Sequence, residues 1–201
     1  MSESEPVRFL PDFESALTFA ARLHSAQSRK GSDTPYIAHL LSVAALVLEN
    51  GGGRDEAIAA LLHDSIEDQG NDYPGGAAAL RAKIAGDFGR QVLAIVEGCT
   101  DADTIPKPPW RERKERYIAH VRHASGAVRL VSCADKLHNA RTIVADLRAI
   151  GPAVFERFKG GRDGTLWYYE SLAEVFIEMG PKALAVELSR TVAVMKSLAA
   201  A

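Results

Sequence analysis

Hydrophobic residues recur at intervals of three and four along most of this chain, which is the spacing of helices that bury one face. Near the N-terminus the positions are Phe13, Leu17, Ala20, Ala21 and Leu23. No stretch shows the sustained alternation of a half-buried strand, and only the short run 128–131 is ambiguous by itself. We therefore predict an all-α fold, a single compact helical bundle of about eight to ten helices.

Glycine and proline residues between these segments mark where the helices should end. We expect Gly31 to cap the end of the first helix and Asp55 to cap the start of the third. The predicted helices cover residues 12–30, 36–49, 55–69, 77–84, 88–99, 111–124, 127–147, 152–158, 165–179 and 181–198. Residues 1–11 are expected to form a flexible arm, so that the domain spans residues 12–199.

The composition excludes several classes of protein. With 201 residues, 47% hydrophobic and 25% charged, the chain suits one globular domain. Its net charge of −2 gives no basic field for nucleic acid or an anionic membrane. The longest hydrophobic run, residues 40–48, is far shorter than the roughly 18–20 residues that span a bilayer. Cys99 and Cys133 lack CxxC spacing and are expected to be reduced. We expect a cytoplasmic protein without nucleic-acid or membrane partners, and its oligomeric state stays open.

The segment LLHDSIEDQ, residues 61–69, carries the densest group of chemically active side chains. In one continuous helix, at about 100° per residue, an imidazole and three carboxylates share one side and the aliphatic residues share the other. These four residues are His63, Asp64, Glu67 and Asp68. An ordinary solvated acidic face has the same pattern, so this segment alone does not establish a site.

Two more residues with metal-binding side chains lie among hydrophobic neighbours, His39 in one predicted helix and Asp135 in another. A buried, unpaired carboxylate costs several kcal/mol, so Asp135 needs a partner. Lys136 or Arg141 could supply it, and a divalent metal ion would meet the same need. Two imidazoles and two carboxylates form a donor set that suits Mn²⁺, Fe²⁺ or Zn²⁺ rather than Ca²⁺.

The order of these residues, an H…HD…D pattern, resembles the metal-binding pattern of the HD-domain phosphohydrolase superfamily. The surrounding motifs are similar to those of the hydrolase domain of RelA/SpoT enzymes and of the small alarmone hydrolases. They are AxxHxxQxRK (21–30), TPYIAH (34–39), AALLHDSIED (59–68), FG followed by VEGCT (88–100) and ADKLHNART (134–142). The resemblance covers residues 13–142.

This resemblance implies an Mn²⁺-dependent enzyme that removes the 3′-pyrophosphate from (p)ppGpp, leaving GDP or GTP. The implied metal ligands are His39, His63, Asp64 and Asp135. Glu67 and Asp68 match the pair that orients and deprotonates the attacking water in this superfamily. A carboxylate one helical turn from the ligands can accept that proton.

Four further residues match positions that contact the nucleotide. Arg29 and Lys30 match the pair that packs on and hydrogen-bonds the guanine base. Asn139 and Thr142 match positions that contact the nucleoside. Without the resemblance, compensation of a helix dipole would explain Arg29 and Lys30.

The chain departs from the family pattern at two positions. Gln69 stands where the family often has threonine, and Asp101 stands where it has lysine. A negative charge near a polyphosphate site leaves the substrate open between (p)ppGpp, (p)ppApp and the 2′-phosphate of NADPH. A non-catalytic nucleotide sensor would be marked by the loss of a ligand or of the Glu67–Asp68 pair, and neither is lost.

Other polar and aromatic segments have two interpretations. The basic residues of segment 111–116, which are Arg111, Arg113, Lys114 and Arg116, suit either a solvated face or a basic rim that meets a pyrophosphate. The aromatic run 167–169 is expected in the core rather than stacked on a base. We expect His24 to pack between helices or to support the ligands rather than to bind metal. No spacing recommends His120, His123 or His138.

Overall fold

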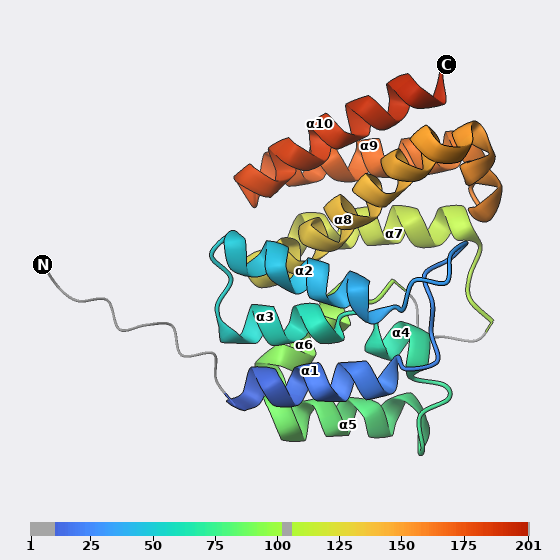
Figure 1. The fold of residues 1–201 in the computed structure, drawn as a ribbon. Coiled ribbons are helices and arrows are strands. Elements are labelled where there is room, and N and C mark those ends of the chain that lie inside the picture. The colour runs from blue at the N-terminus through green and yellow to red at the C-terminus, as the bar shows by residue number, and fades with distance from the viewer. Residues whose placement is uncertain (1–10, 102–105, 201) are drawn as a thin grey trace, which may run out of the picture.

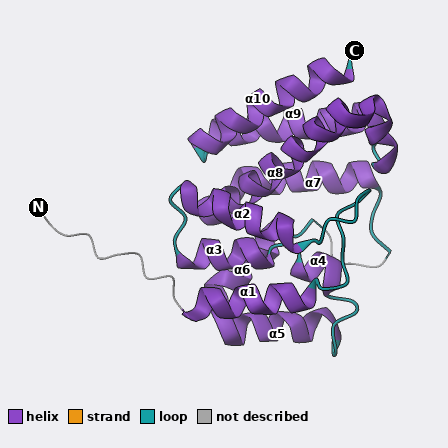
Figure 2. Ribbon diagram, viewed as in Figure 1, coloured by secondary structure: helices purple, strands orange, loops and turns teal. Residues whose placement is uncertain are grey.

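The protein is helical over the residues that the computed structural model describes, which are 11–101 and 106–200. In these ranges the only strand-like pairing is an isolated bridge between Ser28 and Pro35 (Figure 2). The helices are α1 (Pro11–Leu23), α2 (Ile37–Glu49), α3 (Arg54–Leu62), α4 (Ser65–Gln69), α5 (Gly76–Phe88), α6 (Arg90–Cys99), α7 (Trp110–His123), α8 (Gly126–Ile150), the 3-10 helix η1 (Gly151–Arg157), α9 (Gly161–Met179) and α10 (Lys182–Ala199). The predicted all-α class is confirmed. Apart from Pro11, the predicted arm lies outside the described residues.

The long helix α8 organises the bundle (Figure 1). It packs against α2, α3 and α6, and also against η1, α9 and α10. Around this centre, α1 packs on α3, α5 packs on α6, and α7 packs on α9. Because α8 contacts both the N-terminal and the C-terminal helices, a side chain on it can meet residues from distant parts of the chain.

One continuous hydrophobic core fills the bundle. Leu40 in α2, Leu61 in α3, Leu137 in α8 and Phe176 in α9 are fully buried. Burial of each such side chain contributes about 1.5–3 kcal/mol. Leu40 directly follows His39 in the chain, so this packing also holds a predicted metal ligand inside the protein.

The first helix is shorter than predicted. α1 ends at Leu23, and the chain then closes a loop over residues 24–36, which we call the 24–36 loop. The backbone N–H of Tyr36 donates to the carbonyl oxygen of Gln27 at 2.9 Å, which joins the two sides of this loop. Gly31, predicted as the helix cap, instead lies in the loop with φ of +80°, a conformation that favours glycine.

The predicted helix over residues 55–69 is interrupted. α3 ends at Leu62 and α4 begins at Ser65, so that His63 and Asp64 form the junction between them. The regular helix is therefore interrupted between the two halves of the LLHDSIEDQ segment. The angular positions of a single helix therefore do not describe this segment.

One smaller prediction was also wrong, and another is refined. Gly53, not Asp55, precedes α3, and its N–H donates to the Glu56 carboxylate at 3.0 Å, which satisfies a donor at the helix start. The segment predicted as a helix at 152–158 is the 3-10 helix η1.

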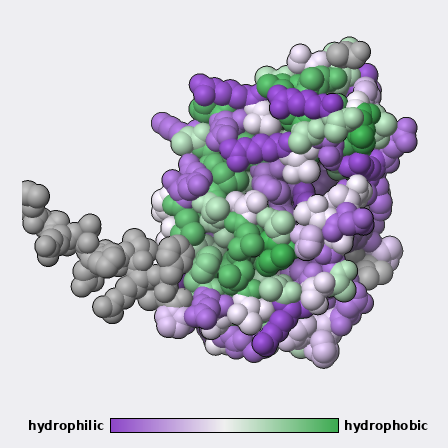
Figure 3. Space-filling view, viewed as in Figure 1, coloured by the Kyte–Doolittle hydropathy of each residue, from purple (hydrophilic) through white to green (hydrophobic). Residues whose placement is uncertain are grey.

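No helix among the described residues combines the length and the hydrophobicity needed to cross a membrane. The face seen in Figure 3 carries hydrophobic residues over α2 and α3, with hydrophilic residues around them.

Candidate metal centre and adjoining pocket

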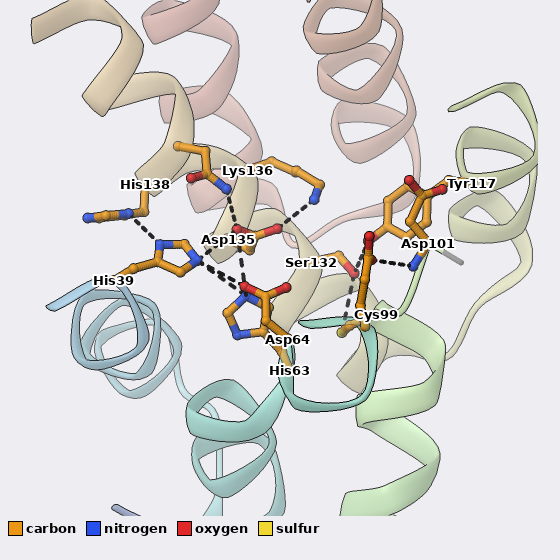
Figure 4. A network of polar contacts seen from close by, with 12 residues as sticks. His39, His63, Asp64, Cys99, Asp101, Tyr117, Ser132, Asp135, Lys136 and His138 are labelled. Carbon is orange, nitrogen blue, oxygen red and sulfur yellow. Dashed lines mark hydrogen bonds and ion pairs between the residues drawn. The ribbon is translucent and has the colours of Figure 1, made fainter. Parts of the chain in front are cut away.

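Three buried side chains from three helical segments converge in the interior. His39 comes from α2, His63 from the end of α3 and Asp135 from α8, and one donor atom from each lies within 4.8 Å of the others. The His39 Nε2 atom is 3.3 Å from His63 Nε2 and 3.2 Å from Asp135 Oδ1 (Figure 4). Their side chains point toward one another from the separate segments that carry them.

Asp64 completes the predicted set because the junction between α3 and α4 directs its carboxylate to the same point. Its Oδ2 atom is 2.9 Å from His63 Nε2 and 3.5 Å from His39 Nε2. The hydroxyl of Tyr36 donates to this same oxygen at 2.6 Å. The structure thus brings all four predicted ligand residues together.

The imidazoles are oriented by partners on their far sides. The Nδ1 atom of His63 lies 2.8 Å from the carbonyl oxygen of Ala60 and donates to it, so Nε2 is the nitrogen that faces the centre and is available to a metal ion. The Nδ1 atom of His39 lies 2.8 Å from Nδ1 of His138. Burial, followed by the charges of His39 and Arg29, lowers the pKa of His138 to about 4, so His138 is neutral and accepts from His39.

Sequence reasoning missed His138. It lies three residues after Asp135 on α8 and so shares a face of the helix with it, which is a usable signal. Supporting partners of this kind set which nitrogen of a ligating imidazole faces the metal.

The electrostatics of the cluster favour a cation. Burial lowers the pKa of His63, but the carboxylates of Asp64 and Asp135 outweigh it, so that the pKa lies well above its ordinary value. Burial also raises the pKa of Asp64, yet the charge of His63 and the hydrogen bonds with His39 and His63 bring it well below the ordinary value. The cluster therefore takes up a proton when no metal balances its carboxylates. Two imidazole nitrogens and two carboxylates fit a divalent transition ion.

Lys136, one of the two partners predicted for Asp135, pairs with its buried carboxylate. Its Nζ atom is 2.6 Å from Asp135 Oδ2, while Oδ1 of the same carboxylate faces the histidines. The side-chain amide of Asn139 donates to Oδ1. Arg141, the other candidate partner, pairs with Glu187 instead. Metal binding and pairing with a lysine are thus compatible, because they use different oxygens.

Glu67 and Asp68 lie in α4, one turn beyond Asp64, and have different neighbours. The Glu67 carboxylate accepts from Lys107 Nζ at 2.8 Å and from the backbone N–H of Asp101 at 3.2 Å. The Asp68 carboxylate accepts from the side-chain amide of Gln27 at 2.7 Å. Surrounding protein atoms, and then the charge of Asp64, raise the pKa of Asp68 to about 6, although the bond from Gln27 lowers it.

A pocket of about 670 Å³ adjoins the cluster and reaches His39 and Glu67. The four residues predicted to bind the substrate, which are Arg29, Lys30, Asn139 and Thr142, all line it. The Arg29 guanidinium donates to Asn139 Oδ1 at 2.6 Å, which joins the 24–36 loop to α8 across the pocket wall. The structure thus places these residues in one cavity beside the cluster of predicted metal ligands.

The charge of this pocket differs from that of the whole chain. Seven lysine and arginine side chains line it, against three carboxylates. The basic residues are Arg29, Lys30, Arg113, Lys114, Lys136, Arg157 and Lys159, and the acidic ones are Glu67, Asp101 and Asp146. A surplus of cations in a cavity of a chain with net charge −2 is suited to a polyanionic ligand.

The negative charge of Asp101 is balanced by two cations. Its Oδ2 atom is 2.7 Å from Lys114 Nζ and also accepts from the Arg113 guanidinium. Both cations line the pocket, whereas Arg111 and Arg116 are exposed and pair with glutamates on their own helix. The basic residues of segment 111–116 therefore divide into two that line the pocket and two that form a solvated face.

The residues of the aromatic run 167–169 also differ in whether they line the pocket. Tyr168 and Tyr169 are buried and line the pocket, whereas Trp167 is not among the lining residues. The Arg111 guanidinium stacks on the Trp167 ring at 3.3 Å from its centroid. This run was expected to pack in the core. The two tyrosines do so, and they also form part of the pocket wall.

Comparison with known proteins gives one family. A family model described as HD domain matches residues 16–166. The guanosine-3′,5′-bis(diphosphate) 3′-pyrophosphohydrolase MESH1 of Xenopus tropicalis is 41% identical over 131 residues, covering 64% of this chain and 67% of the relative. The MESH1 protein of Danio rerio is 34% identical over 182 residues, covering 83% of this chain and 93% of the relative.

The fold comparison agrees with the sequence comparison. A solved structure described as a metazoan ortholog of SpoT that hydrolyses ppGpp superimposes with a TM-score of 0.73 at 25% identity. The match covers 94% of this chain and 96% of that one. A structure of lmo0812 from Listeria monocytogenes superimposes with a TM-score of 0.65 at 26% identity.

Proposed function

Because the chain belongs to the HD domain family, we propose that it hydrolyses the 3′-pyrophosphate of (p)ppGpp, releasing pyrophosphate and GDP or GTP. One observation carries this proposal, which is that the four predicted ligand residues converge beside a pocket with a surplus of cations. A nucleotide that carries two diphosphate groups matches the charge of that pocket. The MESH1 relatives are named for the same reaction.

The metal is proposed to be Mn²⁺, held by His39, His63, Asp64 and Asp135. Fe²⁺ and Zn²⁺ suit the same donors. When bound, such an ion acidifies water and neutralises negative charge on phosphoryl oxygens.

The proton of the attacking water passes to the Glu67–Asp68 pair in this proposal. Asp68 suits the role of base because its pKa of about 6 lies near neutral pH, so that it is ionised and still basic enough to take a proton. Glu67 lines the pocket and is held by Lys107 and the backbone of Asp101, which suits a role in orienting the water.

The nucleotide is proposed to lie along the pocket, with its base at the Arg29–Lys30 end. The Lys30 ammonium is 5.8 Å above the Phe158 ring, so a cationic and an aromatic surface lie together at that end. Asn139 and Thr142 on α8 are proposed to contact the nucleoside. Arg113 and Lys114 lie beside Asp101 in the same pocket and are proposed to bind the pyrophosphate.

The balanced charge of Asp101 supports a polyphosphate substrate despite the departure from the family pattern. With two cations on one carboxylate, this part of the pocket keeps net positive charge. The protein is proposed to act in the cytoplasm on this small nucleotide. A non-catalytic sensor is not favoured, since no ligand residue is missing from the cluster.

Product analysis tests the proposal. Purified protein loaded with Mn²⁺ is incubated in parallel with ppGpp, ppApp, NADPH, GTP and dGTP. Release of pyrophosphate and GDP from ppGpp supports the proposal. Turnover of ppApp or NADPH alone would keep the metal centre and change the substrate, and no turnover of any compound would favour a sensor.

A further inference from the structure

The side-chain amide of Gln27 in the 24–36 loop is bonded on both of its polar atoms. Its Oε1 atom is 2.6 Å from His24 Nδ1 and accepts from Gln69 Nε2 at 2.7 Å. Its Nε2 atom donates to Asp68 Oδ2 at 2.7 Å. We call these four residues the Gln27 network.

Hydrogen-bond chemistry sets the direction of this amide. The oxygen of Gln27 has two lone pairs, and the donors from His24 and Gln69 occupy both. The NH₂ group must then face Asp68. A flipped amide would place an oxygen against the carboxylate and a donor against two other donors. The network is therefore satisfied when Asp68 is ionised and acts as an acceptor.

His24 donates from Nδ1, because the amide oxygen of Gln27 that it faces can only accept. It is 2% exposed, and burial lowers its pKa despite the hydrogen bond with Gln27. Its ring stacks on Tyr36, with centroids 5.3 Å apart. Tyr36 in turn donates to Asp64, so one loop contacts two carboxylates of the candidate site.

The backbone of Gln27 is also held. Its N–H donates to the carbonyl oxygen of His24 at 3.0 Å, and its carbonyl oxygen accepts from Tyr36. A long, flexible side chain therefore extends from a braced backbone, which lowers the entropy cost of keeping the amide in one place.

We propose that Gln27 is a positioning residue for Asp68, and that Gln69 and His24 keep its amide turned so that Asp68 Oδ2 is held and Oδ1 is left to take the proton. This inference rests on the proposed function, in which Asp68 is the base. Gln69 lies where the family often has threonine, so in this chain part of the control of Asp68 comes from a residue outside the family pattern.

Variants of Gln27 separate positioning from packing. Gln27→Met removes the donor at similar volume and should lower kcat by about 10–100-fold with KM changed less than about twofold, as for partners that orient reactive groups. Gln27→Glu keeps the shape but sets an oxygen against Asp68. If Gln27 positions Asp68, kcat should fall further in this variant than in Gln27→Met. If Gln27 only fills space, kcat should fall less than in Gln27→Met. Gln69→Met should give a smaller loss than Gln27→Met, since His24 still holds the amide. Gln91→Met, the same change at an exposed position on α6, should leave kcat unchanged.

A second measurement needs no substrate. In ¹⁵N–¹H spectra of the full chain, assigned with Gln27→Met, the Gln27 side-chain NH₂ pair should shift upon Asp68→Ala, while the Gln91 pair should not. An unshifted Gln27 pair overturns the inference whatever the activity. Wild-type kcat in Gln27→Met, with the shift present, also overturns it. If the Gln27 signals shift as expected but the wild-type protein hydrolyses no nucleotide, only the proposed function is refuted. The contact between Gln27 and Asp68 is then still supported.

Discussion

The two oxygens of the Asp135 carboxylate face different partners. Oδ1 lies 3.2 Å from His39 Nε2 at the metal cluster, and Oδ2 lies 2.6 Å from Lys136 Nζ toward the pocket. Burial raises the pKa of Asp135, but Lys136 and the histidines bring it well below its ordinary value. Asp135 therefore stays ionised, and the metal centre and the pocket are joined through a single side chain.

This arrangement predicts how Lys136 contributes to stability. Lys136→Met leaves a buried carboxylate with one partner fewer, so the free energy of unfolding of the metal-free protein should fall by about 3 kcal/mol. With Mn²⁺ present the loss should be smaller, because the ion compensates the same carboxylate. Urea unfolding with and without Mn²⁺ measures both. Lys196→Met, which removes an exposed pair with Glu170, is the control and should cost less than about 1 kcal/mol. Equal losses for the two variants would contradict the prediction.

Metal binding should release protons at neutral pH. Without metal, the pKa of His63 lies well above its ordinary value, so the ring is protonated at pH 7 and must lose that proton to bind an ion. The affinity for Mn²⁺ should consequently rise as the pH rises toward the pKa of His63. Titration calorimetry in two buffers with different ionisation enthalpies reports the protons released. Identical binding enthalpies in both buffers would show that His63 is already neutral.

The Glu67–Asp68 pair should be needed for turnover and not for metal. The double variant Glu67→Gln, Asp68→Asn keeps the size of both side chains and removes the groups that accept the proton. We expect kcat to fall by about 10²–10⁴-fold, with the bound Mn²⁺ content unchanged. Steady-state kinetics and elemental analysis of the same preparation check the two parts. Full activity in the double variant would refute the proposed role of the pair.

The effect of removing a cation from α7 should depend on whether that cation faces the pocket. Lys114→Met removes a pocket cation, and a lost charge-assisted hydrogen bond of about 1.5–3 kcal/mol corresponds to a rise in KM for ppGpp of about 10–100-fold. Arg116→Met, on the same helix but exposed, should leave KM unchanged. Initial-rate measurements on both variants decide this. Equal effects would mean that α7 acts only through its overall charge.

Tyr36 should support the metal through Asp64. Tyr36→Phe removes the hydroxyl that donates to Asp64 Oδ2, and Mn²⁺ affinity should fall by about tenfold. Tyr73→Phe, the same change in the connection between α4 and α5, should leave the affinity at its wild-type value. Competition with a fluorescent chelator gives both constants. A wild-type affinity in Tyr36→Phe would indicate that Asp64 is held by the histidines alone.

The helices could be predicted from the sequence because their cause is local. The spacing of hydrophobic residues, with glycine and proline between segments, predicted helices over most of the ranges observed. The predictions failed where tertiary contacts replaced helical bonds. The 24–36 loop is closed by a bond between Gln27 and Tyr36, which shortens α1. The junction at His63 and Asp64 follows from contacts with α2 and α8 that the periodicity of one segment cannot show.

By itself, the sequence determined the helical class and which side chains can bind a metal, since both depend on residue type and short-range spacing. Only the tertiary structure decided which of those side chains meet and what faces them. His39 and His138 are 99 residues apart, and Gln27 and Asp68 are 41 residues apart. Such contacts depend on how α2, α4, α8 and the 24–36 loop are arranged in the bundle. Packing over those separations is a property of the whole core, and no local pattern specifies it.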